Sequence, residues 1–239
     1  MRTRSELYDV SWRVFGGAIA CAEAVCEAVV EAMEEAIARR GQAVVALSGG
    51  GTPRVMLSRL GEEALDWTRV TMVLVDERWC DHDDEHSNFK MISAQLEPAV
   101  EAGATIRPLW RASGTAEEAA KAASMELREL LPLDLVVLGM GADAHTASWI
   151  PGAEGVEAAL LDTGPEVRVV RPTDGRHLRL TLTRGVVIAA RRRILHVTGS
   201  EKRAVLDAAL GGDGDWARVP IRAALGGGAI TIYHGAEGP

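Results

Sequence analysis

Short apolar segments alternate with helical segments along most of this chain, and the alternation limits its possible folds more than any other feature. Runs such as Ala43–Leu47 and Leu135–Leu138 are continuously apolar, which is typical of strands buried on both faces. The segment Ala18–Arg40 carries apolar residues at helical spacing and ends at Gly41, a typical helix C-cap. The pattern predicts an α/β fold with a mainly parallel sheet covered by helices on both faces.

The same periodicity and capping signals place the remaining elements. We expect strands at 43–47, 70–75, 106–109, 134–138, 167–170, 177–182, 194–197 and 229–233, and helices at 18–40, 55–60, 87–96, 115–130, 183–190 and 200–210. No linker or internal repeat divides the chain, so we expect residues 1–239 to form one domain.

Composition argues against several classes of protein. The formal net charge is −8, whereas a nucleic-acid-binding protein usually carries a basic face. The three cysteines form no CxxC pair, which argues against a disulfide framework and favours a reducing cytoplasm. No segment has the length and hydropathy of a signal peptide or a bilayer span. We therefore expect a cytoplasmic protein that binds neither nucleic acid nor a membrane.

The segment Leu138–Trp149 carries the strongest signal for chemistry. It follows a predicted buried strand and supplies two glycines, then Asp143 and His145. Open α/β sheets bind ligands where their strands end, and glycines let a ligand approach the backbone. We expect a short helical turn after His145, whose dipole would keep the ring neutral and able to act as a base. The alternative is a capping aspartate beside a passive histidine.

A glycine-rich turn joins the strand 43–47 to the next helix. It contains Gly49, Gly50, Gly51 and Thr52, and Pro53 suits the first turn of that helix. Small residues leave backbone N–H groups free at a helix N-terminus, which favours an anion such as phosphate. The alternative is a tight turn without a ligand, because the lysine and spacing of a P-loop are absent.

Several charged residues stand beside strand ends or within strands. Asp76 and Arg78 follow the strand 70–75, where the arginine could bind an oxyanion or could form a structural ion pair with the aspartate. Arg179 alternates with apolar residues and needs an acidic partner or a ligand anion. Lys202 lies in the first turn of a helix, where its charge opposes the dipole unless an anion binds there. Otherwise it faces solvent.

The acidic segment 81–86 places His82 and His86 four residues apart, as in some metal sites. Zinc requires ligands that converge, however, and so acidic a run is typical of a solvated loop. We expect no metal there.

Five motifs in order make the chain resemble the 6-phosphogluconolactonase family. They are Leu47–Pro53, Asp76–Arg78 with Ser87–Asn88, Leu138–Ser148, Arg179–Thr183 and Thr198–Lys202, and together they span roughly Leu47 to Pro220. The resemblance implies a Rossmann-like sheet shared with sugar-phosphate isomerases and deaminases. It implies hydrolysis of 6-phospho-D-glucono-1,5-lactone to 6-phosphogluconate in the oxidative pentose phosphate pathway, without a cofactor or metal.

On this resemblance we assign roles to the site residues. His145 is the expected base and acid, and Asp143 orients it. Arg78, held by Asp76, is expected to stabilise the oxyanion. The turn Gly49–Thr52, Arg179 and Lys202 are expected to bind the 6-phosphate. The expected partner is thus a small phosphorylated sugar lactone, and the expected protein is a monomer or a small homo-oligomer.

The chain departs from the family pattern at three places. Ala144 stands where the family usually has glycine, Trp149-Ile150-Pro151 replaces Leu-Phe-Pro, and the tail 230–234 lacks the usual Trp and Asp. Two alternatives therefore remain. A glucosamine-6-phosphate deaminase would share the glycine turn and the histidine loop, although Thr146-Ala147-Ser148 follows the lactonase pattern. A non-catalytic sugar-phosphate sensor would bind the product without turnover.

Overall fold

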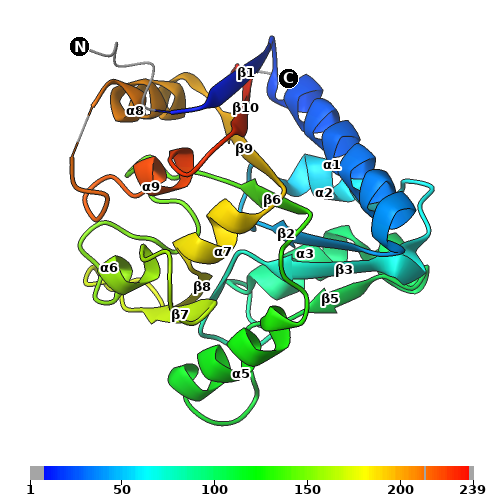
Figure 1. Ribbon diagram of the computed structural model, residues 1–239, viewed down its shortest axis with the longest axis horizontal. Helices are drawn as coiled ribbons and strands as arrows, with labels where there is room; N and C mark the ends of the chain where they lie inside the picture. Colours follow the sequence, from blue (N-terminus) through cyan, green and yellow to red (C-terminus); the bar gives the residue numbers. More distant parts are fainter. Residues whose placement is uncertain (1–7, 213, 237–239) are drawn as a thin grey trace.

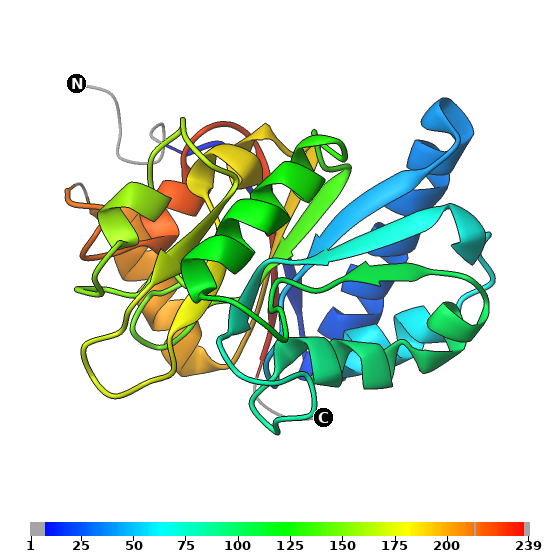
Figure 2. The same ribbon diagram turned by 90° about the horizontal axis from the view of Figure 1, so that it is seen from below.

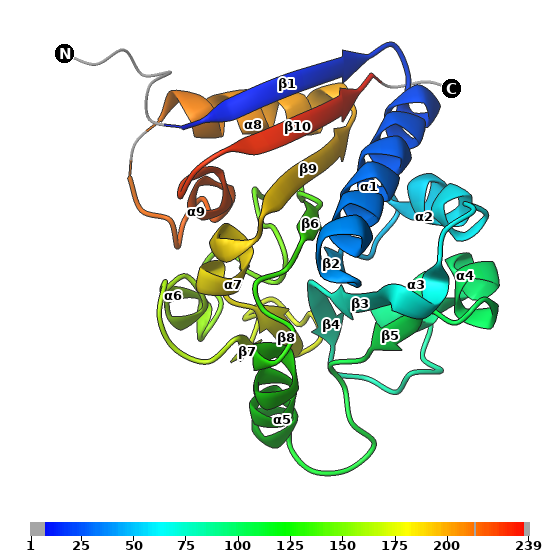
Figure 3. The same ribbon diagram turned by 45° about the vertical axis from the view of Figure 1, so that its right-hand side comes forward.

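The computed structural model describes residues 8–212 and 214–236 of the 239-residue chain. Its centre is a seven-stranded sheet in the order β1-β10-β9-β6-β2-β3-β5, in which every neighbouring pair is parallel. The helices α1, α2 and α3 lie on one side of this sheet and α7, α8 and α9 on the other (Figures 1 and 3). The predicted α/β architecture is confirmed.

The element bounds follow the sequence signals closely in most places. The strands are β1 Val10–Phe15, β2 Ala43–Leu47, β3 Val70–Leu74, β4 Asp76–Arg78, β5 Thr105–Arg107, β6 Leu135–Leu138, β7 Val167–Val170, β8 Arg179–Leu182, β9 Arg192–Thr198 and β10 Ile230–Gly235. The helices are α1 Ala18–Arg40, α2 Arg54–Gly61, η2 Trp67–Arg69, α3 Asn88–Gln95, α4 Glu97–Glu101, α5 Ala116–Arg128, α6 Val156–Ala159, α7 Arg184–Ala189, α8 Ser200–Gly211 and α9 Ile221–Leu225.

The cap signals explain why two helices were predicted accurately. Gly41 takes a left-handed φ of 78° and its N–H donates to Ile37, which ends α1 where the sequence placed its end. Thr115 and Glu118 form the predicted capping box at the start of α5. Both signals are local, so the surrounding fold does not override them.

Asp76 and Arg78 were expected at the end of the strand 70–75, but they belong to a different sheet. After Leu74 the chain leaves the large sheet, and Asp76–Arg78 forms β4 of a second, three-stranded antiparallel sheet, β4-β8-β7. This small sheet lies beside the large one, with α5 packed against β7 (Figures 2 and 3). The sequence reasoning missed it because strands of three or four residues carry almost no periodic signal.

Other expectations required correction. The strand β1 and the helices α4, α6 and α9 were not predicted, and β5 spans Thr105–Arg107 instead of the expected 106–109. The strand expected at 194–197 begins two residues earlier, at Arg192, and Arg193 is buried with its guanidinium donating to the carbonyls of Ala224 and Gly226. Long arginine side chains can be buried where backbone carbonyls receive their N–H groups.

Candidate active site

A cleft of about 340 Å³ opens at the carboxyl ends of β2 and β6. The hydroxyl of Ser48, directly after β2, accepts a hydrogen bond from the N–H of Gly139, directly after β6, at 3.3 Å. This bond joins the glycine turn to the histidine loop. Nine of the ten predicted site residues line the cleft: Gly49, Gly50, Gly51, Thr52, Asp76, Arg78, His145, Arg179 and Lys202.

The tenth predicted residue, Asp143, lies behind the histidine. Its Oδ1 accepts the backbone N–H of His145 at 3.2 Å and also bonds to ring Nδ1 of the same residue. The bond to His145 holds the pKa of the Asp143 carboxyl well below its usual range. This arrangement leaves ring Nε2 as the nitrogen that is not engaged by Asp143.

The conformation of the histidine loop differs from the sequence-based expectation. Residues 146–149 form a turn closed by an isolated bridge, and no helix begins there. The proposed effect of a helix dipole on His145 is therefore wrong. The loop is held instead by Thr146 Oγ1, which donates to the carbonyl of Gly139 at 2.7 Å, and by the N–H of Gly141, which donates to the carbonyl of His145 at 2.9 Å.

Glycine is required at 141 because the histidine ring packs on its backbone. A Cβ built at Gly141 would lie 2.2 Å from Cε1 of His145 and 2.7 Å from Oδ1 of Asp143. Ala144 keeps the left-handed φ of 63° that suits the glycine usual in the family at this place. The alanine therefore does not change the handedness of the loop, although it adds strain.

The glycine turn is fixed by close packing and by an unusual dihedral angle. Gly50 has φ of 101°, a value that L-residues rarely adopt. A Cβ at Gly49 would lie 2.1 Å from Oδ1 of Asn88, at the start of α3. The turn therefore packs directly against the loop that returns from Arg78.

Asp76 does not contact Arg78 in the way the sequence suggested. Its Oδ2 accepts a hydrogen bond of 2.6 Å from the hydroxyl of Ser148, and its Oδ1 accepts one of 3.4 Å from the amide of Asn88. Through these two bonds the buried carboxylate of Asp76 links the histidine loop to α3. These contacts take the place of the expected direct contact between Asp76 and Arg78.

Arg78 and Arg179 both face the cleft from the small sheet. They occupy opposed positions on β4 and β8, and the buried Nε of each has no hydrogen-bond partner among the described residues. Burial lowers the pKa of Arg179, and the nearby Asp76 carboxylate raises it. Two guanidinium groups with unused donors make this wall suited to an anion.

Lys202 supplies a third cation from the first turn of α8. Its Nζ donates to Oγ1 of Thr52 at 3.4 Å, so it reaches across to the glycine turn. Lys202 and Thr52 therefore meet in the cleft, whose lining also includes Gly50.

Sequence reasoning missed four residues of this region. Arg176 lines the cleft and contacts Asp143 at 3.4 Å, whereas Asn88 and Ser148 line it beside Asp76. Glu77 is fully buried behind Arg78. Asn88 and Ser148 lay within the quoted motifs but had no role assigned. Arg176 lies in a polar turn that gave no signal.

The two histidines of the acidic loop have different surroundings. The ring of His82 stacks on Phe89 with centroids 4.3 Å apart, whereas the ring of His86 lies 4.7 Å from that of His177. Within residues 8–212 and 214–236, no three or more His, Cys, Asp or Glu side chains are grouped so that they could hold a metal ion. None of the helices in these ranges is long and apolar enough to cross a bilayer.

Comparison with known proteins identifies the family. Residues 18–232 match the family model described as glucosamine-6-phosphate isomerases/6-phosphogluconolactonase. The chain belongs to this family. A 6-phosphogluconolactonase of Rhizobium meliloti is 41% identical over 214 residues, covering 89% of this chain and 92% of the relative. Another, from Pseudomonas aeruginosa, is 38% identical over 219 residues, covering 90% and 91%.

Solved structures of family members share the fold. A crystal structure of a 6-phosphogluconolactonase from Shewanella baltica superposes with a TM-score of 0.90 at 31% identity, covering 97% of this chain and 99% of that one. The 6-phosphogluconolactonase of Trypanosoma brucei superposes with a TM-score of 0.81 at 27% identity, covering 95% and 96%. The large sheet and the small second sheet therefore belong to a fold that this family uses.

Proposed function

We propose that this protein hydrolyses 6-phospho-D-glucono-1,5-lactone to 6-phospho-D-gluconate, the lactonase step of the oxidative pentose phosphate pathway. One observation supports the chemistry most directly. His145, hydrogen-bonded to Asp143, faces the same cleft as Arg78, Arg179 and Lys202. A base and four cations in one cleft, Arg176 included, suit a neutral electrophile that carries a phosphate. The family relatives named as 6-phosphogluconolactonases support the same substrate.

In the proposed mechanism His145 removes a proton from water as its oxygen attacks C1 of the lactone. The carbonyl electrons move onto the exocyclic oxygen, and Arg78 with nearby backbone N–H groups stabilises this oxyanion. When the tetrahedral intermediate collapses, the bond from C1 to the ring oxygen breaks and His145 returns the proton to that oxygen. Asp143 keeps Nδ1 of His145 engaged, so that Nε2 carries the proton transfer.

The phosphate of the substrate is proposed to bind beside Lys202 and the turn Gly49–Thr52, which are joined by the contact from Lys202 to Thr52. Arg179 adds charge from the side of the small sheet. The N-terminus of α2 follows this turn, and the positive end of its dipole favours a dianion. We assign these groups to binding and Arg78 to the developing charge.

The decisive experiment measures lactone loss against its spontaneous hydrolysis. His145→Ala should lower kcat by roughly 10²–10⁴-fold while the protein stays folded, because a positioned base contributes about that much. His177→Ala is the matched control, since His177 is exposed and lies outside the cleft lining. Unchanged turnover in the His145 variant would exclude the mechanism. Ammonia release from glucosamine 6-phosphate would instead favour a deaminase, and product binding without turnover a sensor.

We also propose that the enzyme works in the cytoplasm as a monomer or small homo-oligomer, without a nucleic-acid partner. The support is indirect: Cys21, Cys26 and Cys80 are unpaired, and the formal net charge is −8. Size-exclusion chromatography with light scattering measures the oligomeric state.

A further inference from the structure

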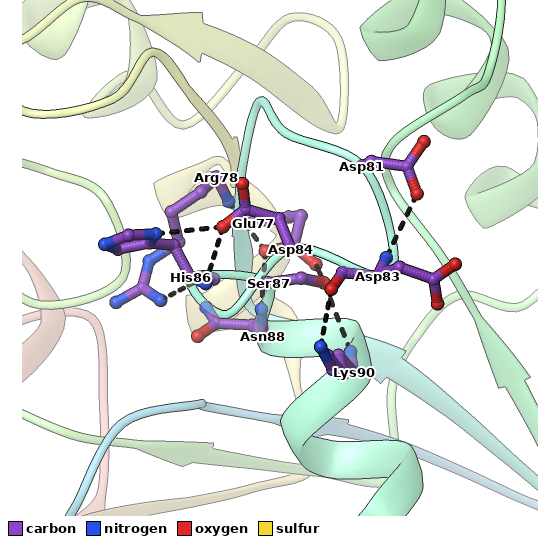
Figure 4. Close-up of polar contacts among 9 residues, drawn as sticks. All are labelled: Glu77, Arg78, Asp81, Asp83, Asp84, His86, Ser87, Asn88 and Lys90. Carbon is purple, nitrogen blue, oxygen red and sulfur yellow. Dashed lines mark hydrogen bonds and ion pairs between the residues drawn. The ribbon is translucent and has the colours of Figure 1, made fainter.

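A buried carboxylate lies directly behind the cleft, on the strand that carries Arg78. Glu77 has 0% of its surface exposed, and it is absent from the cleft lining. Side chains alternate along a strand, so Asp76 and Arg78 face the cleft whereas Glu77 points the other way, toward the start of α3. Figure 4 shows Glu77 between Arg78 on one side and Ser87 and Asn88 on the other.

The two oxygens of Glu77 accept four hydrogen bonds. Oε1 accepts the backbone N–H groups of Arg78 and Asn88, both at 2.7 Å. Oε2 accepts the N–H of Phe89 at 2.7 Å and the hydroxyl of Ser87 at 3.1 Å. All four partners donate, so the site matches a carboxylate and leaves no place for an O–H or an amide N–H.

These bonds connect the two ends of the loop 79–87. The chain leaves the small sheet after Arg78 and enters α3 at Asn88, and one carboxylate binds the backbone at both points. Both residues line the cleft. The guanidinium of Arg78 also donates to the carbonyl of His86, inside the same loop. Displacement of the Glu77 carboxylate would therefore release both ends of the loop together.

Asn88 connects Glu77 to two other residues of the cleft lining, Asp76 and Gly49. Its amide donates to the carbonyl of Asp76 at 3.0 Å and to the carboxylate of Asp76 at 3.4 Å. Its side chain also packs on Gly49, as the 2.1 Å separation of Oδ1 from a built Cβ shows. The position of Asn88 thus affects both the glycine turn and Asp76, which accepts the hydrogen bond from Ser148.

We propose that Glu77 is a positioning residue, which sets the place of Arg78 and Asn88 in the cleft through the backbone at both ends of the loop 79–87. The proposal rests on the proposed function, in which Arg78 acts on the substrate. Glu77 itself touches no substrate. Its buried negative charge also lies beside the opposed cations Arg78 and Arg179, and it favours the charged form of Arg179.

The test compares three variants with the full-length enzyme. Glu77→Gln keeps the shape but sets an amide N–H against N–H donors, whereas Glu77→Asp keeps the charge and shortens the reach. Glu85→Gln is the matched control, because it removes one carboxylate from the exposed part of the same loop. We expect Glu77→Gln to lower kcat/KM roughly 10- to 100-fold, as expected for a lost charged hydrogen-bond network, and Glu77→Asp to restore part of it. Glu85→Gln should match the wild type.

A double-mutant cycle separates positioning from general stability. If Glu77 acts through Arg78, then Glu77→Gln should cost little more kcat/KM in an Arg78→Ala background, because coupled residues are not additive. A merely structural role would lower the melting temperature and give the same fold-loss in both backgrounds, which would overturn the proposal. Where Glu77→Gln fails to fold, the Glu77→Asp variant enters the same cycle with the same two outcomes.

Binding of 6-phosphogluconate, measured by calorimetry, separates this proposal from the proposed function. If the wild-type enzyme turns over no lactone, the proposed function fails, and the cycle is then run on the dissociation constant. Non-additive weakening by Glu77→Gln and Arg78→Ala would still support the positioning role. Additive weakening, or none from Glu77→Gln, would overturn it.

Discussion

Arg78 and Arg179 stand directly opposite each other on the antiparallel strands β4 and β8, and both line the cleft. Like charges in opposed positions of a sheet destabilise it unless a counter-charge is present. The buried carboxylates of Asp76 and Glu77 supply part of this charge, because both favour the charged form of Arg179. A bound phosphate or carboxylate would supply more, so the pair links stability to ligand binding.

We expect 6-phosphogluconate at 100 times its dissociation constant to stabilise the protein by about 2.7 kcal/mol. For a chain of this size that raises the melting temperature by roughly 5–10 °C. Arg179→Ala should reduce the shift, whereas Arg171→Ala should preserve it, because Arg171 forms an exposed ion pair with Glu117. Equal shifts in both variants, measured by calorimetry, would contradict a role for the opposed pair.

Gly141→Ala should displace the ring of His145 without unfolding the protein. The new Cβ would lie 2.2 Å from Cε1 of His145 and 2.7 Å from Oδ1 of Asp143, so both side chains must move away from residue 141. We expect kcat to fall by roughly 10²-fold, since misplacing a catalytic group by about 1 Å can cost that much. Gly211→Ala is the control, because a Cβ there meets nothing within 4 Å. Wild-type kcat in the Gly141 variant would show that the ring position is not critical.

Ala144→Gly should stabilise the histidine loop. An alanine at φ of 63° destabilises the folded state by about 1–2 kcal/mol, and glycine removes this strain. Glycine also increases the conformational entropy of the unfolded chain, which costs roughly 0.4–1 kcal/mol of stability. The expected net gain is about 0.5–1 kcal/mol in urea unfolding. Ala142→Gly relieves no positive φ and should destabilise by about 0.4–1 kcal/mol. A loss of stability at both positions would show that Ala144 is unstrained.

His196 should make the protein sensitive to mild acid. Burial, aided by the Lys202 charge, lowers the pKa of His196 from 6.5 to about 4. As the pH falls, His196 takes up a proton in the unfolded chain before it does so in the folded protein. The free energy of unfolding is therefore highest above about pH 6.5 and decreases as the pH falls toward 4. This loss amounts to roughly 3 kcal/mol at most.

His196→Leu should reduce that pH dependence in urea titrations between pH 7 and pH 4.5. The substitution removes no hydrogen bond, because neither ring nitrogen of His196 has a partner within the described part of the chain. An unchanged slope would mean that other groups cause the acid sensitivity.

Much of the fold could be predicted because its signals are local. The buried strands Ala43–Leu47 and Leu135–Leu138 and the helix Ala18–Arg40 follow from periodicity and caps alone. The small sheet could not be predicted, since β4 has three residues and depends on pairing with β8, about a hundred residues later. The same limit explains β1, whose pairing partner is the C-terminal strand β10.

For the site, the sequence by itself determined which groups are present: a histidine with an aspartate two residues before it, a glycine turn, and cations beside strand ends. Parallel strands end at one edge of a sheet, so these motifs had to meet there. Only the tertiary structure decided their contacts. It turned Asp76 toward Ser148 instead of Arg78, and it set Glu77 between the two ends of the loop that follows Arg78. The contact between Asp76 and Ser148 joins residues 72 positions apart, and the contact between Glu77 and Asn88 depends on how the loop between them folds, so local sequence carries no record of either.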